Sequence, residues 1–335
     1  MNTTSATEWT DVLRHIKSHF VGVAVVAAMQ LELFTALADG PRTAEELAAT
    51  LGVPTRRLRM LLRSLVAAKL VVSDGDRFAN APVAAEFLVK GQPQYMGGSH
   101  ELYSHMFASV LSTAQSIRTG VPQAVQDWTA MPDDRLRAIL RGLNPGAVTQ
   151  GRALAHAHDF SRFTTILDVG GGGGGFAIGA CEVCPRLTAQ VVELPRVAKI
   201  SEEFISSAGL AARIRVVSHD ITAIPLAGSH DAAVLRNLLQ ILAADHARRV
   251  VENVARSLRP GGEIFILGAI LDDDSMGPEG ALASNLFFLN VFEDGEAYME
   301  GEHRSWLETA GFTDIKRSPV RGGLDLSLMT ARTRS

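Results

Sequence analysis

The chain has 335 residues, the length of about two domains. Its hydrophobic content of 47% and charged content of 20% allow a sizeable core and exclude a largely disordered chain. A net charge of −4 argues against a nucleic-acid surface spread over the whole protein. No run of about 20 apolar residues stands out, and only two cysteines are present. We therefore expect a cytoplasmic protein without membrane association.

The N-terminal part predicts a small helical module over residues 1–98. Apolar residues at spacings of three and four predict a helix over 11–38. Thr43 followed by Glu46 is the signature of a capping box at the start of the next helix. After a third helix, an Asp-Gly turn predicts a hairpin over 71–79. Helices followed by a hairpin indicate a winged-helix module.

The third predicted helix of this module carries a row of cations, namely Arg56, Arg57, Arg59 and Arg63. Such a row suggests a ligand-responsive DNA-binding regulator, which is the alternative class of function. Leu31, Leu33 and Phe34 form an apolar face larger than one small module can bury. Together with the acidic balance of the chain, they favour a dimerisation domain, a homodimer and no nucleic-acid partner.

Residues 99–160 predict a mostly helical region that links the two halves, with helices at about 99–119, 133–142 and 146–158. This region carries side chains that can line a substrate pocket: His100, Tyr103, His105, Met106 and Phe107. Each of them can equally pack between two domains. Both interpretations stay open.

Residues 164–193 hold the strongest pattern. Thr164–Val169 is β-branched and apolar, as in a buried strand, and six consecutive glycines follow it. A helix over 176–183 and a second strand over 188–192 come next, and Glu193 ends that strand. Strand, glycine loop, helix, strand and acid form half of a doubly wound nucleotide-binding fold. The sequence therefore predicts a Rossmann-like domain over 161–335.

Asp168, two residues before the first glycine, decides which ligand suits this loop. Gly170, Gly172 and Gly175 satisfy the dinucleotide pattern G-x-G-x-x-G, and Gly170, Gly172 and Gly174 satisfy the G-x-G-x-G of methyl-donor enzymes equally well. A carboxylate at Asp168 would repel a pyrophosphate. It suits the cationic amino-acid end of S-adenosylmethionine (SAM).

The alternation of strands and helices continues to the C-terminus. We expect strands at 213–218, 231–235, 263–267 and 324–332, and helices at 245–258, 285–292 and 301–310. Ligands of an open parallel sheet lie beyond the carboxyl ends of its strands. This rule places Gly170–Gly174, Glu193, Asp220 and Arg236 on one edge.

Cys181 and Cys184 lie three residues apart on the predicted helix after the glycine loop. A C-x-x-C pair can be redox-active or half of a zinc site. No second cysteine pair completes such a site, and the helical spacing favours two packing residues. We expect no metal.

Together these motifs resemble the SAM-dependent small-molecule O-methyltransferases with an N-terminal dimerisation domain, found in plant phenylpropanoid and bacterial natural-product pathways. The segments that carry the resemblance are Leu33–Leu37, Thr43–Ala48, Leu61–Leu65, Leu167–Gly172, Glu193–Val197, Leu258–Gly262 and Ala310–Phe312. It covers nearly the whole chain. It implies an α/β fold in which a mainly α winged-helix dimerisation domain precedes a doubly wound SAM-binding domain.

The resemblance also implies roles for single residues. The implied cofactor-binding residues are Asp168, Gly170, Gly172, Gly174, Glu193, Leu194, Asp220, Ile221 and Arg236. In this assignment Glu193 binds the ribose hydroxyls, Asp220 and Ile221 flank the adenine, and Arg236 lies near the adenine edge. The expected substrate-binding residues are His100, Met106, Phe107, Asn285 and Phe288.

The departures from the family pattern concern catalysis. In the family, Arg-x-x-Leu is followed by a histidine that acts as general base, whereas here Gln240 follows Leu239. An amide cannot take up a proton at neutral pH. The acid that orients the base aligns with Gly268, and a third expected carboxylate is matched only loosely by Glu296. The base and at least one helper are therefore missing.

Three interpretations of this loss remain open. The acceptor can be a phenol or enol acidic enough to ionise unaided. Another group can serve as base, the candidates being His100, Tyr103, His105 and Glu296. The acceptor can also lack a proton, as a thioether sulfur does, with Gln240 orienting it. We expect Gln240, Tyr103 and His105 to be the catalytic residues. A SAM-binding family member with a non-methylating activity is a further alternative.

Overall fold

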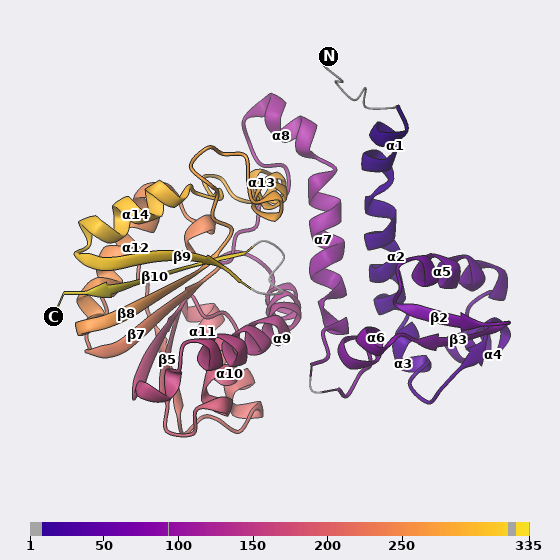
Figure 1. Cartoon of the computed structure of the whole chain (residues 1–335), viewed down its shortest axis with the longest axis horizontal. Helices are drawn as coiled ribbons and strands as arrows, with labels where there is room; N and C mark the ends of the chain where they lie inside the picture. Colours follow the sequence, from indigo (N-terminus) through magenta and orange to yellow (C-terminus); the bar gives the residue numbers. More distant parts are fainter. Residues whose placement is uncertain (1–8, 93, 321–325, 335) are drawn as a thin grey trace, which may run out of the picture. The chain divides into compact units, whose positions relative to one another are not determined.

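The computed structural model describes residues 9–92, 94–320 and 326–334. The chain divides into two compact units, Met1–Ser104 and His105–Ser335 (Figure 1). The N-terminal unit has a hydrophobic core of its own, and the C-terminal unit has a core on each face of its sheet.

The N-terminal unit combines helices with a small sheet of order β1-β3-β2. Its elements are α1 (Trp9–Lys17), α2 (His19–Gln30), α3 (Leu33–Ala36), β1 (Arg42–Thr43), α4 (Ala44–Leu51), α5 (Thr55–Ala67), β2 (Val71–Asp74), β3 (Arg77–Asn80), α6 (Pro82–Phe87) and the 3-10 turn η1 (Gly97–Ser99). The predicted capping box is present, since the Glu46 amide donates to Thr43 Oγ1 at 3.2 Å and the Thr43 amide to Glu46 Oε2 at 2.8 Å. The predicted hairpin is β2–β3.

The single helix predicted over 11–38 is wrong, because three helices occupy these residues. The last break falls at Glu32, whose φ of +52° is left-handed and cannot continue an α-helix. This turn brings Leu33 and Phe34, 0% and 1% exposed, into the core of the unit. Tertiary burial thus overrides an uninterrupted helical pattern.

Much of the apolar surface of α1 and α2 is exposed. The most exposed of these side chains are Trp9, Val12, Ile16, Phe20 and Val21. By length and composition the stretch Trp9–Gln30 is long and apolar enough to cross a membrane, with a mean hydropathy of 1.3 and 22% of its window buried. The expectation that no such run exists is wrong on that measure. On α5, Arg56, Arg57 and Arg63 are exposed, as predicted for a solvated face.

The C-terminal unit is built on a seven-stranded sheet of order β6-β5-β4-β7-β8-β10-β9. Its strands are β4 (Thr165–Val169), β5 (Thr188–Glu193), β6 (Ile214–Ser218), β7 (His230–Arg236), β8 (Leu258–Gly268), β9 (Phe312–Pro319) and β10 (Ser327–Thr333). The strands are parallel except β10, which runs antiparallel to both neighbours. The predicted doubly wound fold is confirmed. Strand β9 was not predicted, and the first two residues of the predicted strand 324–332 lie outside the described residues.

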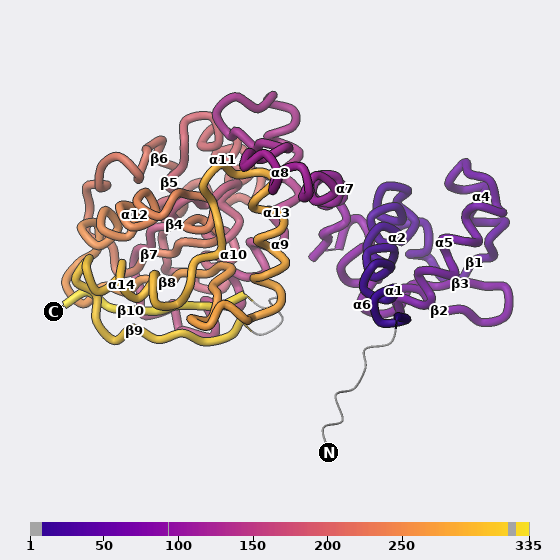
Figure 2. The backbone as a smooth tube through the Cα atoms, turned by 90° about the horizontal axis from the view of Figure 1, so that it is seen from above, coloured from indigo at the N-terminus to yellow at the C-terminus, as the bar shows by residue number. Residues whose placement is uncertain are grey.

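Helices cover both faces of this sheet (Figures 1 and 2). The helices and turns of the unit are α7 (His100–Val110, which begins in the N-terminal unit), α8 (Thr113–Thr119), α9 (Asp133–Ala157), η2 (Phe160–Arg162), α10 (Gly175–Val183), α11 (Pro195–Ser207), η3 (Leu239–Ile241), α12 (Ala244–Ser257), α13 (Glu279–Val291) and α14 (Glu300–Thr309). Side chains of α9, α10 and α11 pack into the core on one face, and side chains of α12 and α14 pack into the core on the other.

Helix α9 differs most from expectation. The sequence predicts two helices separated near Pro145, but one helix of 25 residues contains this proline. A β-carbon added at Gly151 would lie 2.3 Å from the carbonyl oxygen of Phe176, and one at Gly179 would lie 2.1 Å from that of Val148. Helices α9 and α10 therefore touch backbone to backbone, and this packing holds α9 together despite the lost hydrogen bond. The predicted helix over 99–119 is likewise wrong, since it is divided into α7 and α8.

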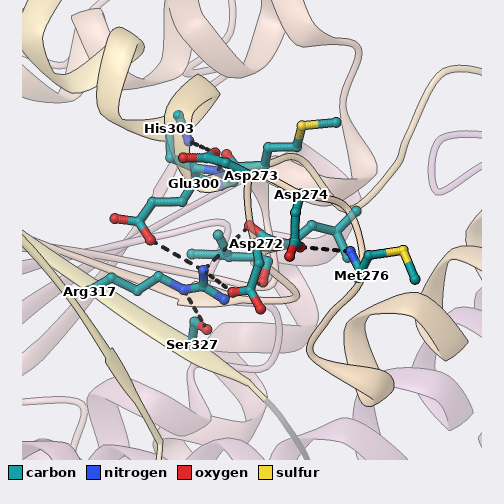
Figure 3. Close-up of polar contacts among 12 residues, drawn as sticks. Asp272, Asp273, Asp274, Met276, Glu300, His303, Arg317 and Ser327 are labelled. Atoms are coloured by element: carbon teal, nitrogen blue, oxygen red, sulfur yellow. Dashed lines mark hydrogen bonds and ion pairs between the residues drawn. The ribbon is translucent and has the colours of Figure 1, made fainter. Parts of the chain in front are cut away.

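Arg317 of β9 fixes the connection between β8 and α13 (Figure 3). Its guanidinium donates to the Ile270 carbonyl at 2.7 Å, to Asp272 Oδ1 at 2.6 Å and to Ser327 Oγ at 3.0 Å. The amide of Gly301 on α14 donates to Asp273 Oδ1 of the same connection at 2.7 Å. The start of α13 is thus tied to β9, β10 and α14.

Candidate active site

Three ionisable side chains stand at the carboxyl ends of adjacent strands. Asp168 of β4 is in register with Val191 of β5 and Val234 of β7. Glu193 and Arg236 lie two residues further along those strands. Because side chains alternate between the faces of a sheet, all three share the face that α9 and α10 cover. Residues far apart in the sequence are therefore gathered at the predicted edge.

The glycine loop separates the two patterns that the sequence leaves open. Gly170, Gly172 and Gly174 have φ values of +64°, +57° and +75°, whereas Gly175 begins α10 without positive φ. The conformation therefore follows the methyl-donor pattern. At position 173 only glycine fits, because an added β-carbon would lie 2.6 Å from the ring of Phe204 and 2.7 Å from Asn144 Oδ1.

Glu193 is held by the loop itself. The amide of Gly172 donates to its Oε1 at 2.7 Å and the amide of Leu194 to its Oε2 at 3.0 Å. Burial raises the pKa of Glu193 to about 7, although both amides favour the ionised form. Each carboxylate oxygen keeps a lone pair for a further donor. The side chain is therefore oriented and still able to accept.

The Asp168 side chain is fully buried, and among the described residues only one of its two carboxylate oxygens has a hydrogen-bond partner. Its Oδ2 accepts from the Ala177 amide at 3.2 Å, while its Oδ1 is buried without a hydrogen-bond partner. Burial raises the pKa of Asp168 to about 6, against the opposing effects of the Ala177 amide and the Arg236 charge. A buried acceptor without a partner costs about 1–3 kcal/mol. This oxygen is suited to a donor supplied by a ligand.

Arg236 approaches Asp168 from the neighbouring strand. Its Nε donates to Gln150 Oε1 at 2.5 Å, and burial lowers its pKa while Asp168 raises it. Gln150 and Asn144, both on α9, were not predicted. Asn144 Oδ1 is buried without a partner and faces the glycine loop. Its spacing from the buried Leu140 and Ala147 makes it a polar member of an apolar helical stripe, a signal already present in the sequence.

The predicted adenine-binding residues follow β6. Asp220 Oδ1 accepts from the Thr222 amide at 2.9 Å and from its hydroxyl at 2.6 Å, which makes a tight local turn. Ile221 is 6% exposed and packs into the core on the α12 face. The Asn253 side chain donates to the Ile221 carbonyl at 2.7 Å, so α12 fixes this turn.

Gln240 occupies the place where the family pattern has its base, and its polar atoms are engaged by the protein. Its Oε1 accepts from the Ala269 amide at 3.1 Å, and its Nε2 donates to Asn237 Oδ1 at 3.4 Å. A β-carbon added at Gly268 would lie 2.3 Å from Gln240 Oε1. A side chain at position 268 would therefore displace Gln240 Oε1 from its hydrogen bond to the Ala269 amide. The two departures from the family pattern form one structural unit.

The predicted substrate-binding residues of α13 lie close to that unit. Phe288 is 7% exposed and packs in a small core with Ala269, the residue that anchors Gln240, and with Ala297. Asn285 Oδ1 accepts from the Ala297 amide at 2.6 Å. Phe287 and Phe292 pack against the same core. Aromatic side chains therefore gather on this side of the edge.

The remaining candidates have different surroundings. On α7, His105 faces Arg135, with Arg135 Nη2 3.1 Å from its Nδ1, and burial together with this charge lowers its pKa. Tyr103 packs on the core of the N-terminal unit, and burial raises its pKa. His100 Nδ1 is buried without a partner. Glu296 is exposed at its surface, with its pKa raised by burial of part of the carboxyl and by Glu302. Met106 and Phe107 are half-buried on α7.

Comparison with known proteins identifies the family. A model of the O-methyltransferase domain matches residues 119–313, and a model of the O-methyltransferase dimerisation domain matches residues 13–90. The 3-hydroxy-5-methyl-1-naphthoate 3-O-methyltransferase of Streptomyces sahachiroi is 33% identical over 301 residues, which cover 87% of this chain and 86% of that protein. The chain belongs to the O-methyltransferase family.

This family member is a SAM-dependent methyltransferase of small-molecule acceptors, and its N-terminal unit is a dimerisation domain. A second relative, the 8-amino-8-demethylriboflavin N,N-dimethyltransferase of Streptomyces davaonensis, is 31% identical over 320 residues, 90% of this chain and 89% of that protein. Human N-acetylserotonin methyltransferase, solved in complex with SAM, shares the fold over the full length of both chains, with a TM-score of 0.84 and 21% identity.

The residues present fit SAM. Among the described residues, Asp168 Oδ1 and Asn144 Oδ1 are buried acceptors without a hydrogen-bond partner beside the glycine loop, and both could accept from the ammonium group of SAM. When bound, SAM supplies a methyl group already activated on a sulfonium. What this chain adds is binding, orientation and, where the acceptor requires it, removal of a proton.

Proposed function

We propose that this methyltransferase holds SAM with Asp168 at the cationic amino-acid end, Glu193 at the ribose hydroxyls, and Asp220 with Ile221 beside the adenine. The unpartnered oxygen of Asp168 and the double backbone anchoring of Glu193 support this assignment. Arg236, which Gln150 holds and whose charge acts on Asp168, would face the carboxylate of that amino-acid end, in place of the position near the adenine edge that the resemblance implies.

The acceptor, in this proposal, carries a nucleophile that needs no base from the enzyme: an acidic phenol, an aromatic amine or a thioether. The observation that carries the proposal is the Gln240–Gly268 unit, which puts an anchored amide in place of a base and its acid. Named relatives act on oxygen and on nitrogen. General-base help is typically worth about 10²–10⁴-fold, whereas positioning is worth up to roughly 7–11 kcal/mol.

The pH dependence of kcat/KM at saturating SAM tests this. We would compare 3-hydroxy-1-naphthoate, a nitro-substituted derivative with a more acidic phenol, and 3-amino-1-naphthoate. Without an enzyme base, the pH at which the rate levels off follows the acidity of each phenol, and the amine gives a flat profile above about pH 7. A break at the same pH for both phenols would show an enzyme base at work.

We further propose a cytoplasmic homodimer in which α1 and α2 face the same helices of a second copy. The exposed apolar residues of these helices lie in or next to the segment matched by the dimerisation model, and Arg14 and Lys17 interrupt the stretch. Light scattering of Ile16→Asp should show a monomer. The control is Val72→Asp, which places the same charge on an apolar residue of comparable exposure in β2, 51% against 60%.

A further inference from the structure

The segment between α8 and α9, residues 120–132, is fastened at its first half to α13. The amide of Ala124 donates to the Asn290 carbonyl and the amide of Gln126 to the Val291 carbonyl, each at 2.8 Å. The Asn290 side chain is fully buried, and its Oδ1 accepts from Ser116 Oγ of α8 at 2.7 Å. In Figure 1 the chain passes from α8 beside α13 to α9. We call residues 120–132 the strap.

The second half of the strap is fastened to the start of α11. Arg196 donates to the carbonyls of Thr129 at 2.6 Å and Met131 at 2.5 Å. Arg196 is three residues beyond Glu193, the residue proposed to bind the ribose. The strap therefore runs from the α13 side of the carboxyl edge to the cofactor side.

Among the residues that the structure describes, the middle of the strap carries two buried side-chain nitrogen atoms without hydrogen-bond partners. They are Nε2 of Gln126, a residue only 7% exposed, and Nε1 of Trp128. Nearby on the strap, the exposed Gln123 has partners for its amide nitrogen, which donates to Thr119 Oγ1 at 3.1 Å and to the Val121 carbonyl at 2.9 Å. A buried donor without a partner costs about 1–3 kcal/mol. The two orphaned groups are therefore suited to a ligand.

The chemistry of the pair selects the ligand group. An indole N–H can only donate, and the Gln126 amide can donate beside it, so an oxygen that accepts two hydrogen bonds satisfies both. The Gln126 amide is bound by the Val291 carbonyl at the end of α13. Four residues further along the chain, Gly295 lies against Gln240, since a β-carbon added there would be 2.7 Å from the Gln240 carbonyl oxygen. This places Gln126 on the acceptor side.

We propose that Gln126 and Trp128 bind a carbonyl or carboxylate oxygen of the methyl acceptor and so select acceptors that carry one on the same ring as the nucleophile. The proposal rests on the proposed acceptor methylation. It adds a specificity determinant to that activity.

The test measures binding to the enzyme saturated with S-adenosylhomocysteine, with 3-hydroxy-1-naphthoate and 2-naphthol as probes that differ by one carboxylate. The wild type should prefer the naphthoate. Trp128→Phe and Gln126→Leu should each weaken the naphthoate about tenfold and change 2-naphthol less than twofold, because a hydrogen bond to a charged oxygen is lost. Gln123→Leu, the same substitution at a satisfied amide, should change neither.

Three outcomes overturn the inference. One is a wild-type enzyme without preference between the probes, whether it binds both or neither. The second is an equal loss for both probes in Trp128→Phe. The third is lost affinity for S-adenosylhomocysteine in the variants, which would assign the strap to the cofactor. Failure of methyl transfer itself is scored separately, by the rate with SAM, so the two proposals fail independently.

Discussion

The two halves of the carboxyl edge differ in how they use their polar atoms. On the cofactor half, around β4 and β5, Asp168 keeps an oxygen without a partner and Glu193 keeps lone pairs after its backbone bonds. On the acceptor half, around β7 and β8, Gln240 has its oxygen committed to the Ala269 amide, and Gly268 has no side chain. At the strand ends, the cofactor half keeps free acceptor atoms, whereas the acceptor half commits the Gln240 oxygen to the backbone and offers free donors on the strap, at Gln126 and Trp128.

Under the proposed function, this difference separates positions that should tolerate exchange from positions that should not. The donor is one fixed molecule, so the residues proposed to hold its charge and its ribose cannot be exchanged freely. The acceptor half needs a base only for acceptors that keep their proton. An anchored amide at position 240 is sufficient where the nucleophile needs no deprotonation by the enzyme before it attacks the methyl group.

The largest effect is expected from removing the unpartnered carboxylate. Asp168→Ala should weaken SAM binding by about 100-fold, because a charged hydrogen bond in a buried site is lost. Calorimetric titration measures this. The control is Asp245→Ala, which removes an exposed carboxylate that pairs with Arg249 on α12 and should leave the affinity unchanged. An unaltered Kd for SAM in Asp168→Ala would contradict the proposal that this carboxylate binds the cofactor.

The next prediction tests the contact between Gln240 and Gly268 in the acceptor half. Gly268→Ala should lower the free energy of unfolding by about 1–3 kcal/mol, since the new β-carbon meets Gln240 Oε1. Gln240→Ala in the same chain should restore most of that loss. Chemical denaturation of the two single variants and the double variant measures the coupling. Additive effects would mean that the two positions are independent.

The pH dependence of SAM binding sharpens the comparison further. The raised pKa values of Asp168, about 6, and Glu193, about 7, mean that both carboxyls take up protons as the pH falls from 8 to 5.5. Affinity for the cationic ligand should therefore fall about tenfold over this range.

Stability without ligand should move the other way. A carboxyl whose pKa is raised in the folded state stabilises the fold most below its ordinary pKa, and this contribution is lost as the pH rises from about 4 to the folded-state pKa values of about 6 for Asp168 and about 7 for Glu193. The melting temperature of the ligand-free protein should fall over that window, and Asp168→Asn should flatten the change. A melting temperature that rises through the same window would contradict these shifts.

The smallest effect is expected at Gln150. Gln150→Leu frees the Arg236 guanidinium that it orients, and should raise the KM for SAM about threefold with little change in kcat, since a single hydrogen bond is lost. Gln123→Leu on the strap again serves as the matched control. A fall in kcat without a change in KM would place Gln150 in the acceptor half.

The sequence by itself determined the parts whose physics is local. Six consecutive glycines between a β-branched strand and a helix, with acids at both strand ends, specify the donor site because few other structures tolerate that composition. The capping box, the hairpin and the strand alternation depend on neighbours a few residues apart. The replacement of a base by Gln240 was equally visible.

Only the tertiary structure decided the parts that depend on contacts between distant segments. Pro145 stays inside α9 because α10 packs against that helix. Glu32 turns the chain because the turn buries Leu33 and Phe34. The close contact between Gln240 and Gly268 joins η3 to β8, and the strap joins α13 to α11. Such contacts leave no periodic trace in the sequence, because the free energy that favours them arises only when the chain is folded.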